Sequence, residues 1–446
     1  MVELKGADGI MRNKRPKYIL IFEDIKNKIN NGEYKSNSRL PSKRDLAMNL
    51  NVSINTIMNA YSLLLDEGYI YSKEKKGYFV SDQPLVIAKE DDNIAYEVID
   101  PSYKYDFTSK NVEPLFQGGF KKAIKEAINN NSYLDRAGLL GSYSLRLEIA
   151  KHLRANRGIS ANADNIVIGS GMEMLEPILR LIPIDNIILE NPGYHRLADM
   201  ARGINKKISY QELDSSGVIV PKGQAILYTT PFNQFPTGIK MTIPRKKEII
   251  SYLNNTDSYL IEDDFDAEFR INQSPTTALY SLDNERVIFF STFSATMFPG
   301  LRIAYSILPN RLAIKYKEYY KGFQATPNSL IAEALGGFIK NGGYASIVNK
   351  RKKLYLEKRR LIEAELLANG IKYNSKANYL SVLIDINRPA DNSLLARLKE
   401  NGILIEALSM HDHLKRASSI LILGYTAIPK DKIKEGISLL KKIIGS

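Results

Sequence analysis

The chain has 446 residues and a formal net charge of +13, from 62 Lys and Arg against 49 Asp and Glu. It has no cysteine, which excludes disulfides and thiolate metal sites. We find neither an apolar run near the roughly 18 residues of a membrane span nor a secretory signal. We therefore expect a cytoplasmic protein without a membrane partner, and the basic excess suits a polyanion.

The N-terminal part of the chain contains three helix-like and two strand-like segments in close succession. They are residues 17–31, 42–50, 55–67, 69–71 and 78–80. Ser42 and Ser53 each stand where a side-chain oxygen can cap the first turn of a helix. Short helices joined by a tight turn and followed by a basic hairpin predict a winged helix-turn-helix domain over residues 11–82.

The third helix of such a domain is the recognition helix, whose first residues face base edges in the major groove of double-stranded DNA. We expect its asparagine and threonine side chains to contact bases or phosphates, and the basic residues before the second helix and on the wing to hold the DNA backbone. The predicted DNA-binding residues are Arg39, Ser42, Lys43, Arg44, Ser53, Asn55, Thr56, Asn59, Lys75, Lys76 and Gly77. The alternative is a small helical bundle whose charged side chains are simply solvated.

The stretch "RLPSKRDLAMNLNVSINTIMNAYSLLLDEGYIYSKEKKGYFV" resembles the GntR-type winged helix. The pattern of that family is Leu-Pro-Ser-x-Arg-x-Leu-Ala, then Val-Ser-Arg-x-Thr-Val, then a wing that contains glycine. This chain departs from it at Ile54, where the family usually has arginine. We therefore expect one DNA contact common in the family to be missing and the base preference to differ.

Residues 83–105 are acidic and lack strong periodicity, which is typical of a linker between two units. Beyond them, apolar strand-like runs alternate with helical stretches. The strand candidates are residues 166–168, 186–190, 225–229, 259–262 and 287–291. This alternation predicts an α/β domain over residues 106–446, with a mostly parallel sheet, helices on both faces and a ligand site at the carboxyl ends of the strands.

Three segments that follow these strands carry residues suited to a ligand. Residues 169–173 are small at a helix start, which suits a bound phosphate or a plain tight turn. Residues 262–266 include four carboxylates, whose repulsion calls for a partner such as a metal ion or a protonated ring nitrogen. Residues 292–302 combine hydroxyls with an arginine, which suits a phosphate or a solvated turn. The pair His411 and His413 is a weak metal signal by spacing alone, and we expect no metal site.

The ordered motifs of the large domain resemble those of fold-type I aminotransferases, which bind pyridoxal phosphate (PLP). The motifs are "ENPGYHR", "TTPFNQFPTG", "IEDDFDAEFR", "STFSATMFPGLRIAY" and "GGYASIVNKRKKLYLEKRR". With the N-terminal domain they make the chain similar to the MocR family, also called GabR-like regulators, over about residues 17–440. The resemblance implies a homodimeric transcription regulator of a DNA operator, which senses a PLP-related or amino-acid-type effector. It also implies a fold-type I effector and dimerisation domain over residues 106–446, with a small subdomain over about 325–446.

The resemblance also implies which residues of this chain would hold PLP or its amine form, PMP. Backbone groups of Gly171 and Met172 would bind the phosphate together with three side chains further on. An aromatic side chain would stack on the ring, and a carboxylate would keep the ring nitrogen protonated so that the ring acts as an electron sink. The implied side chains are Thr292, Ser294 and Arg302 for the phosphate, Tyr194 for stacking, Asp263 for the ring nitrogen, and Asn233 and Phe265 near the ring edge.

The motif departs from the aminotransferase pattern at Ala295, which stands where the family has the lysine that attaches PLP covalently. The chain has no lysine between Arg286 and Arg311 to replace it, and Phe265 stands where relatives have tyrosine. Residues 420–425 also lack the arginine that often binds the substrate carboxylate. We therefore expect no catalytic residue and no transamination, with PLP or PMP bound without a covalent bond or not at all. Two origins stay open for Ala295, natural divergence or an engineered substitution, and the latter would make an aminotransferase with an accessory DNA-binding head the alternative.

Overall fold

A computed structural model describes residues 16–82, 103–108, 118–131, 134, 137–269, 277–374 and 380–445. The chain divides into two compact units, residues 1–100 and 101–446. The predicted linker, 83–105, lies outside the described residues except for its last three positions. The first positions of the predicted N-terminal domain, 11–15, also lie outside them.

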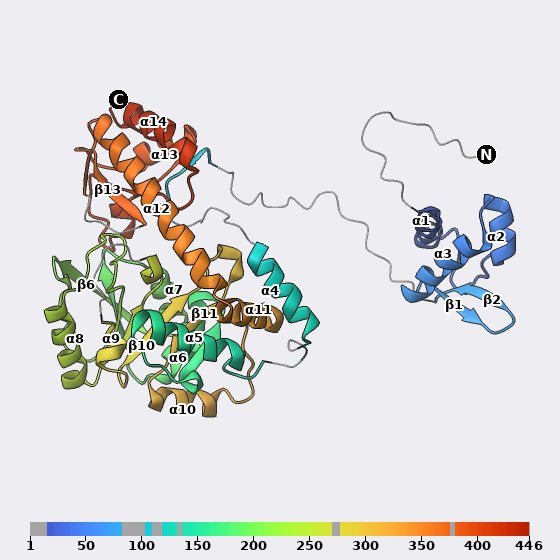
Figure 1. The fold of residues 1–446 in the computed structure, drawn as a ribbon, viewed down its shortest axis with the longest axis horizontal. Helices are drawn as coiled ribbons and strands as arrows, with labels where there is room; N and C mark the ends of the chain where they lie inside the picture. Colours follow the sequence, from blue (N-terminus) through green and yellow to red (C-terminus); the bar gives the residue numbers. More distant parts are fainter. Residues whose placement is uncertain are drawn as a thin grey trace. The chain divides into compact units, whose positions relative to one another are not determined.

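The N-terminal unit is a winged helix-turn-helix, drawn in blue in Figure 1. Its elements are α1 (Lys17–Asn30), α2 (Lys43–Leu50), α3 (Ile54–Asp66), β1 (Ile70–Lys73) and β2 (Gly77–Val80). The helix α3 buries Ile57, Tyr61 and Leu64 against apolar residues of α1, which recur at helical spacing. The strands β1 and β2 pair antiparallel, and Arg39 forms a further bridge to Phe79. The predicted winged helix is confirmed.

The second unit is built on an eight-stranded sheet with the order β4-β11-β10-β9-β8-β5-β6-β7. Its strands are β4 (Ile166–Gly169), β5 (Asn186–Asn191), β6 (Lys207–Asp214), β7 (Gly217–Val218), β8 (Ile226–Thr229), β9 (Tyr259–Asp263), β10 (Val287–Thr292) and β11 (Ala304–Ile307). Neighbouring strands from β10 to β6 are parallel, whereas β4, β11 and β7 pair antiparallel. The predicted α/β fold with a mostly parallel sheet is confirmed.

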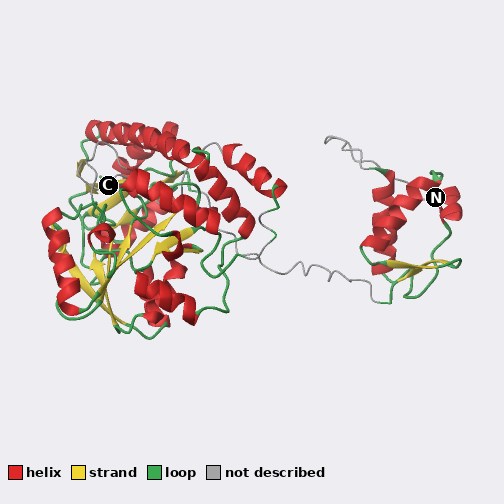
Figure 2. Ribbon diagram, turned by 60° about the horizontal axis from the view of Figure 1, so that its bottom comes forward, coloured by secondary structure: helices red, strands yellow, loops and turns green. Residues whose placement is uncertain are grey.

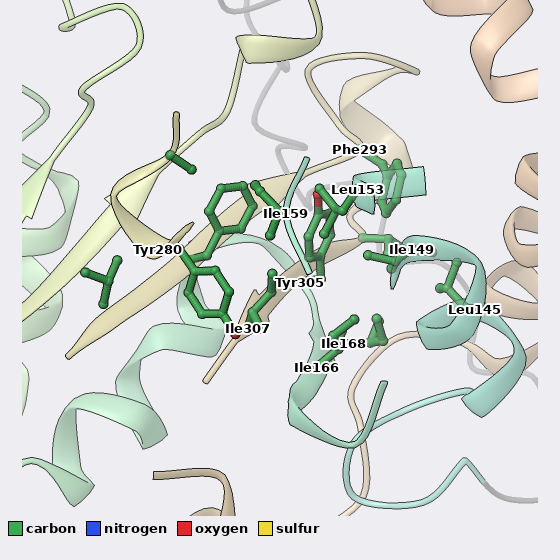
Figure 3. Packing of buried hydrophobic residues seen from close by; sticks show 14 of the residues in the cluster. Leu145, Ile149, Leu153, Ile159, Ile166, Ile168, Tyr280, Phe293, Tyr305 and Ile307 are labelled. Carbon is green, nitrogen blue, oxygen red and sulfur yellow. The ribbon is translucent and has the colours of Figure 1, made fainter. Parts of the chain in front are cut away.

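Helices cover both faces of this sheet, which lies between them in Figure 2. One face contacts α4 (Gly118–Asn129), α5 (Tyr143–Arg157), α8 (Ile243–Thr256), α9 (Leu279–Leu282), α11 (Ser329–Lys340) and the start of α12 (Gly343–Ala368). The other contacts α6 (Leu175–Leu181), α7 (Arg196–Gly203) and α10 (Asn310–Tyr319). Alternate residues of each strand face opposite sides, so Ile166 and Ile168 join the first layer, seen in Figure 3, and Val167 the second.

A smaller subdomain follows along the chain, with its own apolar core. Its sheet has the order β12 (Lys372–Asn374), β13 (Ser381–Asp385), β16 (Ile420–Gly424) and β15 (Glu406–Ala407). Its helices are α13 (Asn392–Glu400), α14 (Ile433–Ile444) and the second half of α12. The pair β3 (Tyr105–Asp106) and β14 (Ile403–Leu404) is parallel. Tyr105, at the end of the predicted linker, is therefore buried in this core, which local sequence does not reveal.

Among the described residues, no helix combines the length and the apolar character needed to cross a membrane.

Candidate functional site

The two helices that form the helix-turn-helix begin at side-chain caps. The Ser42 hydroxyl accepts a hydrogen bond from the backbone N–H of Asp45 over 3.1 Å, and the Ser53 hydroxyl accepts one from the N–H of Thr56 over 3.2 Å. The hydroxyls of Ser53 and Thr56 also lie 2.8 Å apart. These three predicted DNA-binding residues thus set where α2 and α3 begin, and their hydroxyls already have partners in the protein.

A concavity of about 400 Å³ opens between the start of α2, the exposed side of α3 and the wing. It is lined by Arg39, Leu40, Pro41, Ser42, Lys43, Arg44, Ile54, Met58, Gly77 and Tyr78. Arg39 lies beside the wing glycine, since a Cβ added to Gly77 would sit 3.3 Å from the Nε of Arg39. The Nζ of Lys43 lies 5.0 Å from the ring centre of Tyr78. The fold thus brings five of the predicted residues, three of them cationic, to one surface.

The recognition helix exposes two kinds of side chain. Asn55 and Asn59 are exposed, as the prediction for base contacts requires. Ile54 and Met58 lie one helical turn apart, and 47% and 45% of their surfaces are exposed. Sequence reasoning noted Ile54 only as a departure and missed Met58. The signal was an apolar pair at i and i+4 that falls off the buried face of the helix.

The tip of the wing carries Lys75 and Lys76, and both side chains are exposed. The turn is closed by a hydrogen bond from the N–H of Lys76 to the carbonyl of Lys73. Gly77 has a φ of +107°, a backbone conformation that favours glycine. The two lysines do not line the concavity, so the structure presents them as a separate basic feature.

In the large unit, the strand register brings the predicted ligand residues to one edge of the sheet. Thr292 at the end of β10 pairs with Ala304 of β11, which in turn pairs with Gly169 at the end of β4. On the other side, Phe290 of β10 pairs with Asp263 at the end of β9. The segments that follow β4, β9 and β10 therefore lie along the same edge, as ligand sites do in such folds.

The loop after β4 forms a cradle with an arginine from the β10–β11 connection. Gly171 has a φ of +76°, and a Cβ there would lie 2.6 Å from the Nη2 of Arg302. That Nη2 donates a hydrogen bond to the carbonyl of Ser170 over 3.4 Å and pairs with the Glu173 carboxylate over 3.0 Å. Thr326 reaches the same loop through a 3.1 Å hydrogen bond with the Ser170 hydroxyl. Sequence reasoning predicted Gly171 and Arg302 but not these other groups.

The turn after β10 holds Thr292, Ser294 and Ala295. The Thr292 hydroxyl donates to the carbonyl of Ile303 and accepts from the N–H of Ser294, so it shapes the turn. The Ser294 hydroxyl is buried and has no hydrogen-bond partner among the described residues. Ala295 is partly buried in the same turn. A buried hydroxyl without a partner is costly, which points to a missing acceptor beside it.

Each of the four carboxylates at the end of β9 has a different partner. The Glu262 carboxylate accepts from the backbone N–H groups of Leu279 and Tyr280, and Asp264 forms a buried ion pair with Arg157. The remaining contacts join Asp263 to the hydroxyl of Tyr228 and Asp266 to the amide of Asn233 over 3.0 Å. Burial raises the pKa of all four, to about 7 for Glu262, about 7 for Asp263 and about 8 for Asp266, and that of Asp264 despite its arginine partner.

The carboxylate of Asp263 is the member of this group with an open position. Its Oδ2 accepts from Tyr228, but its Oδ1 is buried and has no hydrogen-bond partner among the described residues. An N–H donor that carries a positive charge, such as a protonated pyridine nitrogen, would satisfy this oxygen and stabilise the ionised carboxylate. With the Gly171 cradle and the Ser294 hydroxyl, these groups fit a phosphorylated pyridine.

The remaining predicted ligand residues occupy varied surroundings. Tyr194 is partly buried, with its ring edge-to-face against Phe235 at 5.9 Å, and Met172 packs against the same core layer. Asn233 is occupied by Asp266. Phe265 packs against the core of the small subdomain. The described contacts therefore do not gather all nine predicted residues around one point.

A loop of the small subdomain extends to the same sheet edge. The carbonyl of His411 accepts from the N–H of Gly193 over 3.0 Å, and the N–H of His413 donates to the Asn191 side chain over 2.8 Å. The rings of these histidines are used elsewhere, His413 stacked on Tyr210 and His411 against Glu406. Within the described residues no three His, Cys, Asp or Glu side chains gather as a metal site would require.

A winged helix-turn-helix and an aminotransferase-like sheet are thus joined in one chain. Residues 17–80 match the family model of bacterial regulatory proteins of the gntR family, and residues 105–413 match aminotransferase class I and II. An archaeal alanine:glyoxylate aminotransferase shares the fold of the large unit, with a TM-score of 0.68 and 20% identity over 76% of this chain and 90% of that one.

Relatives of similar length share both parts. The chain is 30% identical to the HTH-type transcriptional regulator YdeL of Bacillus subtilis over 96% of each protein. It is 25% identical to the probable rhizopine catabolism regulatory protein MocR of Rhizobium meliloti, over 96% of this chain and 93% of that protein. It is 26% identical to the pyridoxine biosynthesis regulator PdxR of Corynebacterium glutamicum, over 93% of each. The chain belongs to the MocR-like bacterial transcriptional regulators, in which a GntR winged helix is fused to an aminotransferase class I and II domain.

Proposed function

We propose that this protein is a DNA-binding regulator whose aminotransferase-like domain binds PLP or PMP without a covalent bond and does not transaminate. One observation carries the ligand part: an Asp263 oxygen and the Ser294 hydroxyl, both buried and without a hydrogen-bond partner among the described residues, lie on the sheet edge that also holds Ala295 at the position of the family's lysine. Buried polar groups in folded proteins usually have a hydrogen-bond partner, so two open groups at one sheet edge support a ligand there.

The proposed phosphate contacts are the backbone of Gly171, the Ser294 hydroxyl and the Arg302 guanidinium. A bound phosphate would replace Glu173 as the partner of Arg302, at small cost because both side chains are about half exposed. When bound, PLP supplies an electron sink for charge that develops on a substrate carbon. The Asp263 carboxylate would accept a hydrogen bond from the protonated ring nitrogen and so keep that nitrogen protonated. The Tyr228 hydroxyl, which donates to the same carboxylate, would fix its position.

Residue 295 decides between binding and catalysis. A transaminase needs an amine there, first to attach the cofactor and then to move a proton at the substrate α-carbon. An alanine methyl group does neither, so the site retains groups for binding and lacks the proton carrier. The alternative enzyme reading requires a lysine at this position.

For the N-terminal unit we propose that α3 enters the major groove while Arg39, Lys43 and Arg44 hold phosphates beside it and the wing lysines hold the backbone further out. The large unit would form a homodimer, so that two linked heads engage two half-sites at once. Ligand binding would then change operator occupancy in the cytoplasm only to the extent that the ligand prefers one arrangement of the heads. One relative is named for pyridoxine biosynthesis, which supports a B6-type effector.

Ligand binding is tested by calorimetric titration of the full-length protein with PLP, PMP and pyridoxal, which lacks the phosphate. We expect PLP and PMP to bind and pyridoxal to bind more weakly, with Arg302→Ala reducing this preference for the phosphate. The matched control is Arg286→Ala. Arg286 directly precedes β10, pairs with Asp257 and is not one of the proposed phosphate contacts. Equal affinity for PLP and pyridoxal would refute the proposed phosphate site.

Regulation is tested separately on a DNA duplex selected from a random pool by the full-length protein. Affinity, footprint and DNA bending are measured with and without saturating PLP or PMP. A change in any of the three supports effector control, and their constancy at saturation would refute it. Light scattering of the same samples measures whether the protein is dimeric.

A further inference from the structure

From the apolar pair on the recognition helix we infer that Ile54 and Met58 read thymine methyl groups in the major groove and so set the base preference of the operator. The inference rests on the proposed DNA binding and adds the recognition chemistry to it. It begins from the position of the pair, at the first turn of α3 and the turn after it.

The pair lies at the edge of the buried face of α3, on the side next to the exposed Asn55 and Asn59. Ile57, Tyr61 and Leu64 are buried on the adjoining side of the helix, whereas nearly half of Ile54 and of Met58 remains exposed. Both line the concavity that also holds the three cations of the α2 start. Apolar side chains flanked by cationic side chains suit a partner in which an apolar group lies between anionic groups.

Double-stranded DNA has this arrangement, because its phosphates flank grooves in which the thymine C5-methyl is an exposed apolar group. A second copy of this protein would place Arg39, Lys43 and Arg44 against their own equivalents, and like charges at close range repel. No carboxylate lines the concavity within the described residues to offset that repulsion. The charge pattern therefore favours DNA over self-association as the occupant.

The neighbouring side chains predict the sequence context. Asn55 and Asn59 follow the apolar pair around the helix and are exposed, and asparagine pairs with the N6 and N7 of adenine. One helical turn rises about 5.4 Å, between one and two base-pair steps of about 3.4 Å. We thus expect two thymines within two base-pair steps of one another in each half-site, beside adenines.

Thymine and uracil differ only by the methyl group, which gives a direct test. Duplexes are selected from a random pool by the full-length protein, and each thymine of the enriched sequence is replaced singly by deoxyuridine. Affinity is measured by fluorescence anisotropy at one fixed salt concentration. Burial of one methyl group corresponds to about a fourfold change in affinity, so two positions per half-site should lose roughly that factor.

Variants assign the effect to the two side chains. Ile54→Ala should abolish discrimination between thymine and uracil at one position and Met58→Ala at the other. Met48→Ala is the matched control, since Met48 is 76% exposed on α2 but does not line the concavity, and it should leave both effects intact. Thermal unfolding confirms that the variants fold, and the comparison of thymine with uracil in the unmodified protein needs no variant.

The outcomes separate this inference from the proposed function. Tight, saturable binding with equal affinity for thymine and uracil at every position would overturn the inference and leave DNA binding standing. Discrimination that survives in both Ile54→Ala and Met58→Ala would also overturn it. A change of oligomeric state in the variants without loss of discrimination would mean that the pair contacts a second copy instead. Failure of the pool to enrich any sequence would overturn the proposed DNA binding and the inference with it.

Discussion

Replacement of Asp263 by asparagine is expected to weaken PLP and PMP binding by about 10- to 150-fold. The Oδ1 of Asp263 is buried and has no hydrogen-bond partner in the part of the chain that the structure describes, so a ring N–H would form its hydrogen bond with a charged acceptor. Such bonds contribute about 1.5–3 kcal/mol, which converts to that range of affinity. Asparagine keeps the size of the side chain and an oxygen that accepts from Tyr228, so the packing around it should persist.

Affinity is measured by calorimetric titration at pH 8, where a carboxyl group with a pKa of about 7 is ionised. Glu262→Gln is the matched control on the same strand, because the hydrogen bonds that Glu262 accepts within the described residues come from the backbone N–H groups of 279 and 280. We expect Glu262→Gln to lower the unfolding temperature while PLP affinity stays unchanged. The reasoning is refuted if Asp263→Asn binds PLP as tightly as the parent, or if Glu262→Gln weakens binding equally.

Four further outcomes follow from the same structure. Ala295→Lys should produce a visible absorption band with PLP that survives dialysis; a band that dialyses away would mean that residue 295 does not face the ligand. Because burial raises the pKa of Asp266 to about 8, the folded state retains a proton that the unfolded state releases near pH 4, and stability should fall as pH rises between these values. Asp266→Asn should flatten that fall in unfolding temperature, and an unchanged slope would contradict the assignment. Ser53→Ala should destabilise the N-terminal unit by about 1 kcal/mol in urea titrations through loss of a helix cap, and no change would exclude that role. Lys75→Ala should reduce the slope of log affinity against log salt by about 1 if the wing holds a phosphate, whereas an unchanged slope would remove the wing from the interface.

Much of the fold could be predicted from local sequence because its signals lie within a few residues of one another. Ser42 and Ser53 cap the two helices as predicted, and α3 begins at Ile54, one residue before the predicted start. The five apolar runs proposed as strands all belong to the central sheet, since a strand buried on both faces needs continuous apolar residues.

The candidate site was less predictable, since its chemistry depends on contacts between distant segments. The sequence does not distinguish the four carboxylates of residues 262–266. In the structure three of them bind different partners, Arg157, Tyr228 and Asn233, and one oxygen of Asp263 has no partner among the described residues. Those partners come from other elements, so local spacing could not indicate which carboxylate would remain available. Phe265 is a second example. It packs against the core of the small subdomain, and local sequence does not indicate that contact.

The sequence by itself determined the two kinds of unit, the helix starts of the winged helix and the absence of a lysine at position 295. Only the tertiary structure decided which of these residues share a surface. It placed Arg302 beside Gly171 across 131 positions of chain, and Ile54 and Met58 beside the cations before α2. The physical reason is that periodicity and capping act over a few residues, whereas a binding surface is formed by strand order and helix packing, which join segments far apart in the chain.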